Sequence, residues 1–164
     1  MPQILLSLGS NIEPERNLRL AVRALREQFG QLSLSPVYRT PAVGFDGPSF
    51  LNLVAACQSG QSAAAIGKRL KALEDELGRS RGGAKFSSRS IDIDLLTYGD
   101  LCAGQGGPNI PRDEILRYAF VLKPLADLVG GQRHPCLKKT YAELWQAFGV
   151  TQEPSPVSFD WTGL

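Results

Sequence analysis

Two aspartates, Asp92 and Asp94, have the type and spacing in this 164-residue chain that most directly suggest chemistry. They alternate with Ile91, Ile93 and Leu95, which is the period of a half-buried strand. On a strand, residues i and i+2 point to one face, so both carboxylates would project together from backbone positions about 6.5–7 Å apart. Paired carboxylates supply the hard oxygen ligands that Mg²⁺ prefers. We therefore expect a magnesium site on this strand.

A basic, glycine-containing stretch directly precedes the two aspartates. Its residues are Arg79, Arg81, Gly82, Gly83, Lys85 and Arg89. Arginine pairs bidentately with phosphate oxygens, and glycine allows a loop to close over a ligand. The chain has no Gly-x-x-x-x-Gly-Lys-Ser/Thr run, so it is not a P-loop protein. The stretch and the adjacent acids together favour a polyphosphate site.

Both patterns also have plainer explanations. An alternating strand usually has its polar face in water, and a basic loop is usually solvated or contacts RNA. However, aspartate is a poor strand former, and two like charges on one strand face repel each other. A divalent cation would explain why Asp92 and Asp94 share a face.

Composition limits the class of protein. The net charge of +2 argues against a bulk nucleic-acid binder, and the length fits one domain over residues 1–164. Without a positive leader or a bilayer-length apolar run, we expect a cytoplasmic protein with no membrane partner. Cys57, Cys102 and Cys136 lack metal-type spacing and are predicted to be small buried residues in a reducing compartment. His134, the single histidine, is predicted to be structural or exposed.

The elements that must position these residues follow from the apolar periodicity. We expect strands at 4–8, 32–38, 50–57 and 91–98, with helices at 14–29 and 62–77. This β-α-β-β-α-β order predicts a ferredoxin-like plait, an α+β fold whose mostly antiparallel sheet has helices on one face.

Additions to that core are expected in the second half of the chain. Short helices are predicted at 113–118 and 121–128, and Thr140 with Glu143 matches a capping box for a last helix. The second strand contains Pro36, which predicts an edge strand. The tail at 151–164 has two prolines and little pattern, so we expect it to be loosely packed.

With these motifs in view, the chain resembles the 6-hydroxymethyl-7,8-dihydropterin pyrophosphokinase family from Gly9 to about Leu128. The most specific match is the run Arg89-x-x-Asp92-Ile-Asp94-Leu-Leu. Further matching runs are Gly9-Ser10-Asn11, Tyr38-Arg39-Thr40-Pro41, Phe50-Leu51-Asn52 and Phe120-Val121-Leu122-x-Pro124-Leu125. Several motifs in the right order are much stronger than any one alone.

The resemblance implies transfer of pyrophosphate from ATP to the hydroxymethyl group of a reduced pterin, releasing AMP, in folate biosynthesis. It implies a monomer in which Asp92 and Asp94 hold two Mg²⁺ ions. The catalytic residues it implies are Arg81, Arg89, Asp92 and Asp94. The ATP-binding residues it implies are Lys71, Glu74, Arg81, Lys85 and Arg89, and we also expect Arg112 and Arg117 to contact ATP. The pterin-binding residues it implies are Thr40, Pro41, Val43, Phe50, Asn52 and Phe120, with the two phenylalanines stacking on the ring.

The chain departs from the family pattern around the phosphates. Arg112 stands where the family usually has a histidine, and Tyr118 stands where it carries an arginine. Arg117 is adjacent, but a shift of one residue on a helix turns a side chain by about 100°. The usual Gly-Pro before Arg89 is Ser87-Ser88, the usual tryptophan is Phe86, and residues 103–109 offer no cation.

Three hypotheses follow from these observations. The first is an active Mg²⁺-dependent pyrophosphokinase whose loops at 43–50 and 80–91 close over ATP. The second is a divergent paralogue that binds pterin or nucleotide with weak or altered activity. The third is an RNA-binding plait, which would need a basic face and an aromatic strand motif that the sequence lacks.

Overall fold

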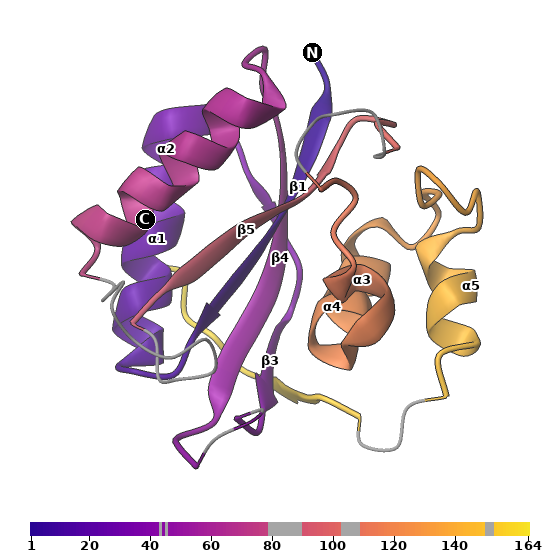
Figure 1. Cartoon of the computed structure of the whole chain (residues 1–164). Coiled ribbons are helices and arrows are strands. Elements are labelled where there is room, and N and C mark those ends of the chain that lie inside the picture. The colour runs from indigo at the N-terminus through magenta and orange to yellow at the C-terminus, as the bar shows by residue number, and fades with distance from the viewer. Residues whose placement is uncertain (43, 45, 79–89, 103–108, 150–152) are drawn as a thin grey trace.

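The computed structural model describes residues 1–42, 44, 46–78, 90–102, 109–149 and 153–164. Its centre is a six-stranded sheet in the order β5-β1-β4-β3-β6, with β2 also paired to β4 (Figure 1). The strands are β1 (Gln3–Ser10), β2 (Ser33–Leu34), β3 (Val37–Thr40), β4 (Phe50–Gln58), β5 (Asp92–Tyr98) and β6 (Ser155–Val157). The strand pairs are antiparallel, which confirms the predicted α+β class.

Three of the helices begin where the sequence carries start signals. The helices are α1 (Pro14–Phe29), α2 (Ala63–Glu76), α3 (Glu114–Arg117), α4 (Ala119–Val129) and α5 (Tyr141–Gln146). Pro14 occupies the first turn of α1, and the Ser62 hydroxyl caps α2 by accepting from the Ala65 N–H. The predicted capping box of Thr140 and Glu143 is present at α5.

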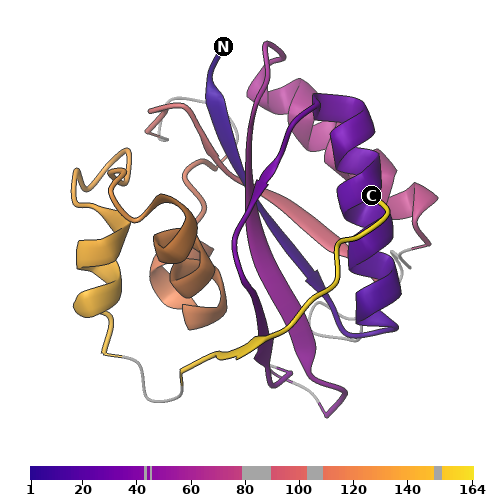
Figure 2. The ribbon, with the colours of Figure 1, turned by 180° about the vertical axis from the view of Figure 1, so that it is seen from behind.

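Helices cover both faces of the sheet: the two plait helices lie on one face, as predicted, and the added helices of the second half cover the other (Figures 1 and 2). Helices α1 and α2 cover one face, where their apolar residues pack on alternate strand residues such as Leu6, Leu8 and Leu53. Helices α3, α4 and α5 lie on the other face over Leu5 and Val54. We call these layers the α1–α2 core and the α3–α5 core. The second core forms because α4 is itself strongly apolar and must be buried.

The predicted strand at 32–38 is two strands, and its second half is not an edge. Pro36 has no N–H to donate to a neighbouring strand, and the strand is interrupted there, between β2 and β3. Ser35 bridges the break, because its N–H donates to the Val54 carbonyl and its hydroxyl accepts from the Val54 N–H, each at 2.9 Å. Strand β3 then lies between β4 and β6.

Residues 153–164 are packed on the molecule, which corrects the prediction of a loose tail. Strand β6 pairs with β3, and the tail then runs along α1 (Figure 2). Phe159, Trp161 and Leu164 pack against the α1–α2 core. Arg19 of α1 donates hydrogen bonds to the carbonyls of Asp160 and Thr162. The pairing joins residues 116 to 120 positions apart in the chain, which a local pattern does not reveal.

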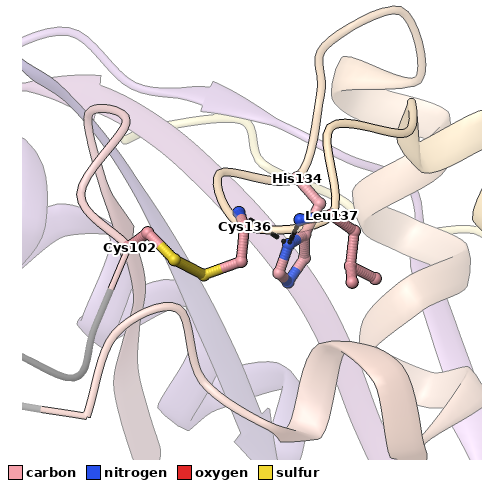
Figure 3. The surroundings of a disulfide bond; sticks show 4 residues. All are labelled: Cys102, His134, Cys136 and Leu137. Atoms are coloured by element: carbon pink, nitrogen blue, oxygen red, sulfur yellow. Dashed lines mark hydrogen bonds between the residues drawn. A yellow bond between two sulfur atoms is a disulfide. The ribbon is translucent and has the colours of Figure 1, made fainter.

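Two of the three cysteines are joined, which corrects the prediction of three small buried thiols. Cys102, in the connection after β5, forms a disulfide with Cys136, and their Cα atoms are 5.2 Å apart (Figure 3). Both residues are exposed. Cys57 is free and buried as expected, and burial raises its pKa to about 11.

His134 is structural, as predicted. It is 3% exposed, and its Nδ1 accepts from the N–H groups of Cys136 and Leu137, each at 3.2 Å (Figure 3). Among the described residues, no helix has both the length and the apolar character to cross a membrane.

Candidate functional site

A row of site residues crosses four strands on the face that carries the α3–α5 core. In the sheet register, Asp92 of β5 is opposite Gly9 of β1, Gly9 is opposite Asn52 of β4, and Asn52 is opposite Tyr38 of β3. Neighbouring strands are about 4.8 Å apart, so Asp92 and Asn52 lie about 10 Å apart at the backbone. A ligand lying across β1 can therefore contact both residues.

Asp92 and Asp94 share one face of β5, as the alternation predicted. Ile93, which lies between them, and Leu95, which follows Asp94, are buried in the α1–α2 core. The two carboxylates therefore point to the opposite side of the sheet. Both aspartates are partly exposed. The pair is thus accessible at the edge of the sheet.

Glu74 of α2 supports β5 from the outer edge. Its carboxylate accepts a 2.8 Å hydrogen bond from the Ile93 N–H, and the residue is only 2% exposed. Because β5 is the outermost strand on this side, the Ile93 N–H points away from β1 and needs such a partner. Glu74 therefore holds the backbone between Asp92 and Asp94, a contact that the family resemblance alone did not predict.

Arg112 places a cation beside the acid pair. Its Nη2 lies 3.9 Å from Asp94 Oδ1, and its Nε donates to Glu114 at 3.0 Å. Burial lowers the pKa of Arg112, but the hydrogen bond to Glu114 and the charges of Asp94, Glu114 and Asp92 outweigh burial and raise it. The backbone N–H of Arg112 bonds to the Leu96 carbonyl. Arg112 is therefore fixed near the acids.

The other end of the row is built around Asn52. This side chain is 5% exposed, and its Nδ2 donates to Thr40 Oγ1 at 2.8 Å. A Cβ on Gly9 would lie 2.7 Å from Asn52 Oδ1, closer than real Cβ contacts. Glycine is therefore required beside Asn52. Phe50 is two residues before Asn52 on β4, and so on the same face, and is partly buried.

The run Gly9-Ser10-Asn11 also joins the strand ends around the site. Ser10 is fully buried, and its hydroxyl donates to the Ser90 carbonyl at 2.5 Å, just before β5. Asn11 donates from Nδ2 to the Pro48 carbonyl at 3.1 Å, just before β4. These bonds tie the approaches to Asp92 and Phe50 to the end of β1.

Helix α4 carries Phe120 at its first turn. The Phe120 ring stacks on Tyr118, with centroids 4.9 Å apart and planes at 24°. Tyr118 has an extended conformation between α3 and α4 (φ −126°, ψ 125°), so the expected 100° helical rotation between Arg117 and Tyr118 does not apply. The Arg117 guanidinium lies 5.7 Å from the Tyr118 ring centre. These three residues form one layered group that the sequence reasoning missed.

The remaining predicted site residues are either exposed or outside the described part of the chain. Lys71 lies on α2, one helical turn before Glu74, and is exposed. Pro41 directly follows β3 and is also exposed. The predicted residues that lie outside the described part of the chain are Val43, Arg81, Lys85 and Arg89, together with Phe86, Ser87, Ser88 and residues 103–108.

The acid pair fits Mg²⁺ by the chemistry of its donors. Within the described residues, no cluster of three or more His, Cys, Asp or Glu side chains could hold a metal. Mg²⁺ does not need such a cage, because it usually binds one or two carboxylates together with waters and substrate phosphates. Asp92 and Asp94 meet that requirement.

Comparison with known proteins agrees with this geometry. The family model described as 7,8-dihydro-6-hydroxymethylpterin-pyrophosphokinase (HPPK) matches residues 5–130. The chain belongs to the HPPK family. The function of this family is pyrophosphate transfer from ATP to hydroxymethyldihydropterin in folate biosynthesis.

Curated HPPK relatives match most of the chain. The 2-amino-4-hydroxy-6-hydroxymethyldihydropteridine pyrophosphokinase of Porphyromonas gingivalis is 34% identical over 134 residues, covering 78% of this chain and 91% of that protein. The enzyme of the same name from Pseudomonas aeruginosa is 31% identical over 137 residues, covering 81% and 84%. In a mitochondrial folate synthesis bifunctional protein of Pisum sativum, the match covers only 25% of the relative.

A solved structure shows the same fold. The HPPK-DHPS protein of Plasmodium falciparum superposes with a TM-score of 0.71 at 12% identity, over 90% of this chain and 44% of that one. At this identity the likeness establishes the fold alone.

Proposed function

We propose that this HPPK-family chain transfers the pyrophosphoryl group of ATP to 6-hydroxymethyl-7,8-dihydropterin and releases AMP. The observation that carries the proposal is the row from Asp92 through Gly9 to Asn52. It sets a pair of carboxylates at one end and a buried amide at the other, with no side chain at Gly9 between them. An acid pair suits a phosphate-bound metal, and an amide both donates and accepts, as the edge of a pterin requires.

Asp92 and Asp94 would hold the magnesium, for which we propose two ions. When bound, Mg²⁺ neutralises phosphate charge and supports in-line geometry. The chain's own residues supply position and electrostatics: Glu74 holds the strand between the acids, and Arg112 adds positive charge at the phosphate end. Lys71, Arg81, Lys85 and Arg89 stay predicted ATP contacts on the family resemblance, and Arg117 stays one because it adjoins the position of the family arginine.

At the pterin end, Asn52 would pair with the edge of the ring. Its amide is already oriented by Thr40, so little side-chain freedom is lost on binding. Phe50 and Phe120 would stack on the two ring faces. Pro41 and Val43 stay predictions for this end of the site.

The setting of the protein is also proposed. We propose a monomer with no nucleic-acid partner, because the net charge is only +2.

We keep the cytoplasmic location as a proposal, since its relatives include bacterial HPPK enzymes. The exposed disulfide between Cys102 and Cys136 argues against a reducing compartment. Trapping free thiols in intact cells distinguishes a cytoplasmic location from an oxidising compartment, because a cytoplasmic protein would show both cysteines reduced.

The decisive experiment is an AMP-release assay with ATP, Mg²⁺ and 6-hydroxymethyl-7,8-dihydropterin. Wild-type protein should release AMP only when all three are present, and Asp94→Ala should lose nearly all of that activity. Asp100→Ala is the matched control, because Asp100 is exposed in the turn beyond the other end of β5. Wild-type turnover by Asp94→Ala would refute the metal role.

A second function has one observation in its favour. Arg112 is paired with Glu114 and lies 3.9 Å from Asp94, so a fixed cation is already present beside the acids. A divergent HPPK paralogue that binds pterin with weak or altered turnover would fit that arrangement. Calorimetry that shows pterin binding, together with no AMP release, would favour this second function.

A further inference from the structure

Two hydrogen bonds and a cation–π contact join the proposed pterin end of the site to helices α4 and α5. The Tyr38 hydroxyl on β3 donates to Asp127 Oδ2 on α4. Asp127 Oδ1 accepts from Lys123 Nζ at 2.9 Å, one turn earlier on α4. Lys123 Nζ in turn lies 5.6 Å from the ring centre of Trp145 on α5. Strand β3 and both helices are therefore linked by polar contacts.

The Tyr38 end of these contacts is buried and keeps its proton. Tyr38 is 5% exposed. Burial, the hydrogen bond to Asp127 and the charges of Asp127 and Glu153 all raise its pKa. The hydroxyl is therefore a permanent donor at neutral pH, and the contact does not switch with modest changes of pH.

The position of this contact connects it to the pterin end of the site. Tyr38 is directly opposite Asn52 in the register of β3 and β4, and both side chains lie on the α3–α5 face. Phe120 belongs to the same helix as Asp127, seven residues earlier, so the two are about 10 Å apart along the axis. The hydrogen bond that holds Asp127 against β3 therefore also fixes the position of Phe120 relative to Asn52.

We propose that Tyr38 is a positioning residue for the pterin substrate, because through Asp127 it holds α4 and Phe120 at a set distance from Asn52. This inference rests on the proposed function, which places the pterin between those side chains. A flat ring stacks well only within a narrow range of separations. Loss of the tyrosine hydroxyl should therefore loosen the pterin end and leave the phosphate end unchanged.

The test is Tyr38→Phe, which removes one hydroxyl and keeps the buried ring. We expect the KM and the calorimetric Kd for the hydroxymethyl pterin to rise roughly tenfold, as for loss of one hydrogen bond to a charged group. The KM for ATP should stay within about twofold of wild type. Asp127→Ala should match Tyr38→Phe, and the double variant should show no further rise. Asp127→Asn keeps an acceptor for the hydroxyl and should restore most of the affinity.

Tyr98→Phe is the matched control. Tyr98 packs against the α1–α2 core, and its hydroxyl donates to the Gln61 carbonyl at 2.7 Å. It should lose some stability and keep the wild-type pterin KM. A wild-type pterin Kd in Tyr38→Phe, or equal rises for pterin and ATP, would overturn the proposal.

The outcomes also separate this inference from the proposed function. If wild-type protein binds the pterin but releases no AMP, the proposed reaction fails, and the Kd values alone decide the role of Tyr38. If wild-type protein binds no pterin, both fail together. Should Tyr38→Phe not fold, Asp127→Ala and Asp127→Asn carry the same comparison.

Discussion

The two faces of the sheet use the same strands for different purposes. On the α1–α2 face, alternate residues of β1, β4 and β5 are apolar and fully covered by two long helices. On the other face, the apolar contacts with α3–α5 stop short of the row at Asp92, Gly9 and Asn52. One face of the sheet thus carries a continuous apolar core, whereas the other carries an apolar core over part of its area and polar site residues over the rest.

This difference has a physical cause in the strand period. Leu8 and Gly9 are neighbours in β1 and both are buried, yet Leu8 packs in the α1–α2 core and Gly9 lies against Asn52 on the other face. A sheet allows such a separation because successive side chains point to opposite faces. Mutations of adjacent residues should therefore affect stability and ligand binding separately.

The largest effect on stability should come from Leu8→Ala. Leu8 is 0% exposed in the α1–α2 core, and truncating a buried leucine typically costs about 2–5 kcal/mol. Urea unfolding measures the loss. Leu116→Ala is the control, because Leu116 is 39% exposed, and it should change stability by about 0.5 kcal/mol or less. An equal loss in both variants would contradict the assignment of Leu8 to the buried α1–α2 core.

Breaking the disulfide should have the next largest effect, on the other face. Cys102 and Cys136 are 34 residues apart in the sequence, and a bridge of this kind typically contributes about 2–4 kcal/mol. Reductant should lower the melting temperature of wild-type protein and leave that of a Cys102→Ser, Cys136→Ser double variant unchanged. Equal melting temperatures with and without reductant would show that the α3–α5 face does not depend on the bridge.

Gly9→Ala should act mainly on binding. The added Cβ would press on Asn52 Oδ1, so either Asn52 must move away from Thr40 or β1 must shift. Either movement should lower the free energy of unfolding by about 1–3 kcal/mol. Pterin affinity, measured by calorimetry, should fall more than stability does. Ser7→Ala, one alternate position earlier on the same face of β1, is the control and should bind pterin normally. Unchanged pterin affinity in Gly9→Ala would show that Asn52 does not need its present position.

The smallest effect should be a pH dependence from His134. Burial lowers its pKa, so the folded state favours the neutral ring. Its stabilising contribution is complete above about pH 6.5 and is lost as the pH falls through the folded pKa, with a slope of at most about 1.4 kcal/mol per pH unit. Protonation would also remove the acceptor at Nδ1 for Cys136 and Leu137.

The control for His134 is His134→Asn, whose side-chain oxygen can accept the same backbone N–H groups without titrating. Unfolding midpoints measured between pH 5 and pH 7.5 should fall more steeply with acid in wild-type protein than in this variant. Parallel curves would show that another group controls the acid response.

Local patterns predicted much of this molecule correctly. The alternation at Asp92 and Asp94, the capping residues Ser62 and Thr140, and the apolar spacing of α1 each depend on a few neighbouring residues. The expected loose tail was wrong, and the face taken by the added helices α3, α4 and α5 was not predicted, because both depend on which distant surfaces need covering. Asp127 gave no sequence signal, since its spacing from Lys123 is that of an ordinary surface ion pair.

The amino-acid sequence alone determined the secondary-structure order, the shared face of the two aspartates and, through several ordered motifs, the resemblance to HPPK. The tertiary structure decided that Gly9 lies between Asp92 and Asn52, that Tyr38 reaches Asp127, and that Cys102 meets Cys136. The physical reason is range. Strand and helix periods are properties of adjacent residues, whereas sheet register and helix packing bring together residues that no local pattern relates.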